Sequence, residues 1–88
     1  MSMERDRALG RFMVLRKKAY ELGIKAQSLL SDIHEETNTL LTGKDFMEVD
    51  FKKIKILADE CISIKNDFSN VDKEMKELDA TYDLKKER

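Results

Sequence analysis

Two long stripes of apolar residues, each repeating at alternating steps of four and three, constrain this chain more than any other feature. Such spacing marks the a and d positions of heptad helices, which bury one narrow face against a neighbouring helix. The pattern therefore predicts two helices that pack along their length. The first stripe comprises Ala8, Phe12, Leu15, Ala19, Leu22, Ala26, Leu29 and Ile33. The second comprises Ile54, Leu57, Cys61, Ile64, Phe68, Val71, Met75, Leu78 and Tyr82.

A short break lies between the two stripes. Gly43 suits the left-handed residue that ends a helix. Asp45, followed by Glu48, is a variant of the capping box and predicts the start of a second helix. Because so short a connection makes two helices antiparallel neighbours, the expected fold is all-α, an antiparallel two-helix hairpin of long coiled-coil-like helices.

The expected boundaries follow from the stripes and the break. We predict one helical-hairpin domain over 1–88, with helices over about 3–42 and 46–84 and a turn at 43–45. Charge favours the same pairing, because the basic start of the chain would lie beside its acidic end. In the register that this implies, large residues layer with small ones, as Ala26 would with Ile64.

The stripes fail towards the loop. Glu36 and Asp50 occupy d positions there, where the pattern requires apolar side chains. We expect a separate apolar cluster at the tip, made of Leu40, Leu41, Phe46, Val49 and Phe51.

Further apolar residues lie beside the stripes, and a lone hairpin leaves them uncovered. Helices with two apolar faces usually contact more than one neighbour. The favoured interpretation is that two hairpins pack into a homodimeric antiparallel four-helix bundle. A groove for an amphipathic helix of another protein and ordinary scattered surface hydrophobics are the alternatives. The predicted interface residues are Leu9, Met13, Tyr20, Ile24, Phe51, Ala58 and Ile62.

Composition favours association as well. A chain of 88 residues without Trp buries little surface, and small folds usually add disulfides, metal or a partner. One Cys forms no internal disulfide, and no Cys/His cluster suits a structural metal. We expect a cytoplasmic protein, because the sequence shows neither a signal-peptide pattern nor a run of about 20 apolar residues.

Few residues offer chemistry. His34 is the only histidine and falls beside the stripe, where we expect it to be solvated. Cys61 lies on the stripe, where a cysteine acts as a small hydrophobe. We predict no catalytic, cofactor-binding or metal-binding residue, and a solvated acidic face where a cation site is the alternative. That face comprises Asp32, Glu35, Glu36 and Asp50.

One basic cluster stands near the start of the chain. With a net charge of −1 and acidic residues of the second helix expected alongside, nucleic-acid binding is disfavoured, as is a membrane surface. The sequence thus predicts a non-enzymatic protein–protein interaction module, a small adaptor, assembly or chaperone-like protein. The alternative is a regulatory nucleic-acid-binding helical protein using this cluster. Its members are Arg5, Arg7, Arg11, Arg16, Lys17 and Lys18.

Overall fold

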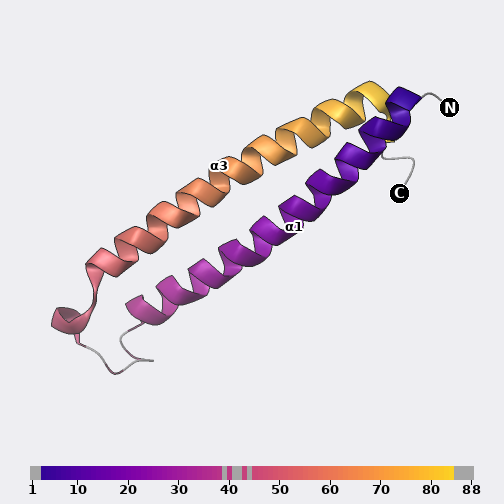
Figure 1. Cartoon of the computed structure of the whole chain (residues 1–88). Coiled ribbons are helices and arrows are strands. Elements are labelled where there is room, and N and C mark those ends of the chain that lie inside the picture. The colour runs from indigo at the N-terminus through magenta and orange to yellow at the C-terminus, as the bar shows by residue number, and fades with distance from the viewer. Residues whose placement is uncertain (1–2, 39, 41–42, 44, 85–88) are drawn as a thin grey trace.

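The computed structural model describes residues 3–38, 40, 43 and 45–84 and shows the all-α antiparallel hairpin that the stripes predict (Figure 1). Helix α1 spans Met3–Thr37, the 3-10 turn η1 spans Phe46–Glu48, and helix α3 spans Phe51–Tyr82. The described residues contain no strand. The molecule is a rod of 63 × 19 × 15 Å, with the first turn of α1 and the last turn of α3 at the same end (Figure 1).

Helix α1 is shorter than predicted. It ends at Thr37 rather than near residue 42. Thr37 and Asn38 are weak helix formers, and the Thr37 hydroxyl donates to the backbone oxygens of Ile33 and His34 at 2.8 and 3.3 Å. Gly43 has the predicted left-handed conformation, with φ of 73°, and lies six residues beyond the end of α1.

Helix α3 begins at Phe51 rather than at residue 46. Asp45 does act as a cap, because its Oδ1 accepts from the Met47 N–H at 2.8 Å, but it caps only η1. The helix itself is capped by Asp50, whose Oδ1 accepts from the Lys53 N–H at 3.0 Å. The connection is therefore longer than the predicted turn at 43–45.

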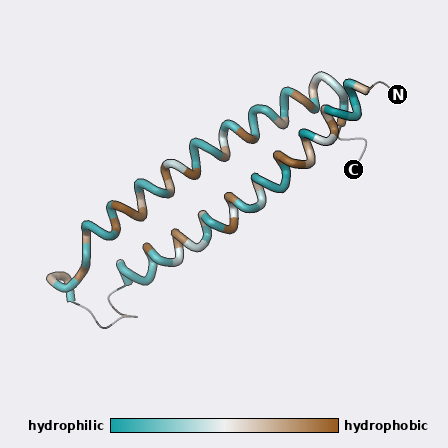
Figure 2. The backbone as a smooth tube through the Cα atoms, in the orientation of Figure 1, coloured by the Kyte–Doolittle hydropathy of each residue, from teal (hydrophilic) through white to brown (hydrophobic). Residues whose placement is uncertain are grey.

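Helices α1 and α3 pack against each other, and the burial of the stripe residues places the stripes at this contact. Figure 2 shows hydrophobic colour recurring along both helices. Every stripe residue is buried or half-buried except Phe68, whose surface is 44 % exposed. At the open end of the hairpin, Ala8 and Phe12 pack with Leu78 and Tyr82, as the antiparallel register predicts. The stripes therefore position the helices, and Phe68 marks the place where their contact is incomplete.

The end of α3 adds a core residue that the stripes did not predict. Asp83 is left-handed, with φ of 54°, and its N–H donates to the Asp79 oxygen at 2.7 Å. The chain thus turns back, and Leu84 becomes completely buried against Ala8 and Phe12. Arg5 closes this end, because its Nε donates to the Tyr82 oxygen at 3.3 Å, a carbonyl at the negative end of the helix dipole.

A separate property of the helices concerns membranes. Neither of the two long helices, over the residues that the structure describes, combines the length and apolarity required to cross a bilayer.

Candidate interaction surface

The two helices leave two long sides along their line of contact, and these sides differ. We call the charged flank the side lined by Arg11, Lys18, Asp67, Asn70 and Glu74. The open flank is the opposite side, where Gly23, Gln27 and Leu30 of α1 face Lys65 and Ser69 of α3 across a groove.

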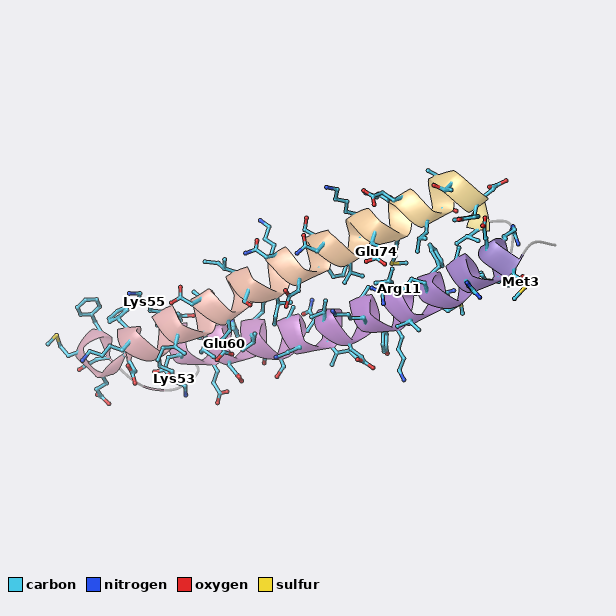
Figure 3. All side chains as sticks on the ribbon, turned by 45° about the horizontal axis from the view of Figure 1, so that its top comes forward. Met3, Arg11, Lys53, Lys55, Glu60 and Glu74 are labelled. Carbon is cyan, nitrogen blue, oxygen red and sulfur yellow. The ribbon has the colours of Figure 1, made fainter. Side chains whose placement is uncertain are left out.

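The charged flank is bridged by an ion pair between the helices. Arg11 Nε donates to Glu74 Oε2 at 2.6 Å and Arg11 Nη2 donates to Glu74 Oε1 at 3.2 Å, a two-pronged contact. Figure 3 shows these two side chains reaching towards each other between the ribbons. The hydrogen bond from Arg11 lowers the pKa of the Glu74 carboxyl, and the same bond raises the pKa of Arg11.

The open flank holds a groove of about 480 Å³ in the middle of the hairpin. Its floor includes Gly23 and Ala26, whose small side chains leave the gap unfilled. A methyl group added at Gly23 would meet no atom within 4 Å. Phe68 and Leu30 form part of the groove walls, and about half of the surface of each residue is exposed. The groove is therefore an apolar hollow that the chain itself does not close.

The predicted interface residues divide between this flank and other places. Met13 and Tyr20 of α1 and Phe51 and Ile62 of α3 are exposed. Met13 and Tyr20 lie fourteen and seven residues before the groove-lining Gln27, Phe51 lies fourteen before Lys65, and Ile62 lies seven before Ser69. Because seven residues make about two helical turns, these four residues lie on the same side of their helices as the groove.

The remaining predicted interface residues are less exposed than these four or point elsewhere. Leu9 is half-buried and packs against the core cluster of Ala8 and Phe12. Ala58 is also half-buried. Ile24 is exposed but points away from α3, because it lies two residues, or about 200°, from the inward-facing Leu22 and Ala26. The seven residues thus do not form one continuous surface.

None of the seven predicted interface residues lines the groove itself. Among the residues that do, Gly23 and Leu30 flank the first stripe in the sequence and Phe68 belongs to the second. The signal that could have found them is the pair of small residues Gly23 and Ala26 on α1, which share the groove with Cys61 of α3. Small side chains at a seam leave a gap that larger neighbours only border.

The predicted tip cluster is only partly present. The rings of Phe46 and Phe51 lie 5.6 Å apart at a tilt of 55°, which is a favourable aromatic contact. Val49 is half-buried. Leu40 is 97 % exposed and takes no part in a cluster, and Leu41 lies outside the described residues.

Glu36 explains how the seam tolerates acidic residues near the loop. Its side chain is buried, Oε1 accepts from the Asp50 N–H at 3.2 Å, and Oε2 lies 3.6 Å from Lys53 Nζ. These contacts join the end of α1 to the start of α3. A carboxylate therefore replaces an apolar layer, because it satisfies backbone and charge at a helix N-terminus.

The residues with chemical potential are dispersed. His34 is exposed, as predicted, and its Nε2 lies 3.4 Å from Asn38 Nδ2. Cys61 is half-buried rather than buried, because it lines the groove, and its thiol is free. Across the described part of the chain, His, Cys, Asp and Glu side chains form no group of three or more that could hold a metal ion.

The basic cluster is partly occupied by α3. Arg5 donates to backbone oxygens of Tyr82 and Asp83, and Arg11 binds Glu74. Arg16 and Lys18 are exposed, and the latter shares its surface with Asp67 and Glu74. Two of the four guanidinium groups that would contact phosphates are therefore engaged within the hairpin.

In comparisons with known proteins, no protein-family model, no curated protein and no solved structure matches the chain. The interpretation of the groove therefore rests on its own geometry.

Proposed function

We propose that the chain is a non-enzymatic protein–protein interaction module that acts through helix–helix packing, as a small adaptor, assembly or chaperone-like protein. Its assembled form in this proposal is a homodimer, an antiparallel four-helix bundle with coiled-coil-like packing.

One observation carries the proposal, namely the amount of surface that the hairpin leaves exposed. The chain exposes 6896 Å², whereas a compact protein of its mass, 10.3 kDa, exposes about 5,400 Å². The difference is about 1,500 Å², and a stable interface of standard size takes about 800 Å² from each partner. The elongated hairpin can therefore give up enough surface to support a specific complex.

The thin core supports the same proposal. Two helices bury a single seam, and on α3 only Ile64 and Val71 are buried within the helix itself. A core of this size gives a marginal fold, which association stabilises by mass action. The half-exposed Phe68 and the uncovered groove are the places where added packing would contribute most.

The non-enzymatic part of the proposal rests on the character of the groove. Its walls are mainly aliphatic and aromatic, with Leu22, Leu30 and Phe68 prominent, and such a surface suits packing rather than proton transfer. We place the protein in the cytoplasm in this proposal, because the free Cys61 thiol fits a reducing compartment.

Light scattering behind a sizing column tests the function. At tens of micromolar the expected molar mass is twice the chain mass of 10.3 kDa. A strict monomer at those concentrations contradicts the homodimer. Capture of a specific helical partner by that monomer would then leave the broader role as an interaction module standing.

A further inference from the structure

Resting on that proposed function, we propose that a second copy of the chain packs on the open flank, so that the two grooves face each other and both charged flanks stay in solvent. The proposal assigns one of the two sides of the hairpin as the dimer interface.

The distribution of exposed apolar residues is the first step. Ile62 lies seven residues before the groove-lining Ser69, and Met13 and Tyr20 lie fourteen and seven residues before the groove-lining Gln27. Each is exposed. The groove therefore has exposed apolar residues of both helices beside it, as an interface core requires.

The charged flank has the opposite character. Its hollow, about 140 Å³, is lined largely by polar groups around the Arg11–Glu74 pair. Covering that pair would remove its charges from water, which costs free energy without creating new apolar contact. Val14 and Ile56 are exposed on this side of their helices, but they flank charged neighbours rather than a groove.

The surface area and the charge of the groove point to a second copy as the occupant. The hairpin can give up about 1,500 Å² relative to a compact protein, which exceeds the roughly 800 Å² per partner of a standard interface. The groove lining includes Lys65 and Asp72, and Asp72 pairs with Lys76 of the same helix at 2.8 Å. The open flank thus carries charges of both signs, so a two-fold arrangement does not press two surfaces of a single sign together.

A matched pair of substitutions separates the two flanks. Ile62→Glu places a charge on the open flank, and Ile56→Glu makes the same change on the charged flank. The two isoleucines belong to α3 and are 58 % and 59 % exposed, so the cost within one hairpin is similar. Ile56 lies fourteen residues before Asn70, which lines the charged flank.

Sedimentation equilibrium over a concentration series measures the dimer dissociation constant of each variant. We expect Ile62→Glu to raise it at least about tenfold, because the dimer would bury the new carboxylate twice. We expect Ile56→Glu to change it less than about twofold. Circular dichroism of both variants checks that the helices remain formed.

The outcomes distinguish the inference from the function on which it rests. A wild-type chain that stays monomeric overturns both homodimer and interface. A wild-type dimer that Ile56→Glu weakens as much as Ile62→Glu overturns the interface and leaves the dimer standing. If Ile62→Glu loses helicity, the pair Met13→Glu and Val14→Glu repeats the comparison on α1, where both residues are exposed.

Discussion

The two flanks share one seam, yet one is bridged and the other is open. On the charged flank, the guanidinium of Arg11 binds the carboxylate of Glu74 across the seam. On the open flank, Gly23 occupies the corresponding border and offers no side chain. This contrast indicates that the heptad seam determines how the two helices pair, whereas the residues beside the seam determine which side is available to a partner.

The largest expected effect contrasts the core cluster at the open end of the hairpin, which contains Phe12 and Leu84, with the groove. Phe12→Ala removes a side chain that is almost fully buried with Leu84, and we expect a loss of about 3–5 kcal/mol in unfolding free energy. Phe68→Ala removes a partly exposed ring, so the loss in a dilute monomer is smaller, about 1–2 kcal/mol. Chemical denaturation followed by circular dichroism measures both.

The dependence on protein concentration separates the losses at Phe68 and Phe12 further. The loss caused by Phe68→Ala is expected to grow as the concentration rises, because the dimer adds contacts around the ring. The loss caused by Phe12→Ala should not grow. Equal, concentration-independent losses at the two positions would remove the distinction between a finished core and an open groove.

The next effect lies at the loop end. Glu36→Ala leaves the Asp50 N–H and the Lys53 ammonium without this carboxylate, and we expect a loss of about 1–3 kcal/mol in unfolding free energy. Glu36→Gln is the control, because its amide oxygen can still accept from the Asp50 N–H. Thermal melts should rank wild type above Glu36→Gln and Glu36→Ala lowest. An unchanged melt for Glu36→Ala would show that these contacts do not join the helices.

Substitutions at two glycines of α1 are expected to have a smaller effect, and at one of them the effect on the monomer is opposite to the effect on the dimer. Gly10→Ala and Gly23→Ala each add a methyl group that meets nothing within 4 Å in the single hairpin. We expect each to stabilise the dilute monomer by up to about 1 kcal/mol, because alanine is the better helix former. Only Gly23→Ala should also weaken the dimer, since Gly23 lines the groove. Identical behaviour of the two variants in both assays would argue against close packing at Gly23.

The smallest effect concerns pH on the charged flank. Because the hydrogen bond from Arg11 lowers the pKa of Glu74 in the folded chain, the pair stabilises the fold above the unfolded pKa of glutamate. This contribution is lost as pH falls through the lowered folded value. Melting temperatures from neutral to acid pH should therefore fall slightly less in Glu74→Gln than in wild type, and added salt should reduce the difference. A steeper acid loss in the variant would contradict this sign.

The sequence was sufficient for the pairing of the helices because the stripes are long and a hairpin offers few alternatives. Leu78 and Tyr82 pack against the cluster of Ala8 and Phe12, as the antiparallel register predicts. The predicted helix ends on the loop side were wrong because local hydrogen bonds decided them. Thr37 competes for helical oxygens, and Asp45 caps only one turn before Asp50 starts α3.

The groove was harder to predict because it depends on what is missing at the edge of the seam. The stripe placed Phe68 inside the contact, whereas small neighbours such as Ala26 leave it exposed. Leu84 was missed for a different reason. The left-handed Asp83 returns it to the core only after the helical pattern has ended.

The reaction of Cys61 with a maleimide tests directly whether a second copy covers the open flank, because this thiol lines the groove. The rate should fall as chain concentration rises through the range in which the molar mass doubles. Ser63→Cys in a Cys61→Ser background places the thiol seven residues before Asn70, on the charged flank, and its rate should stay constant. A doubling of mass with no protection of Cys61 would contradict the claim that the open flank is the one that a second copy covers.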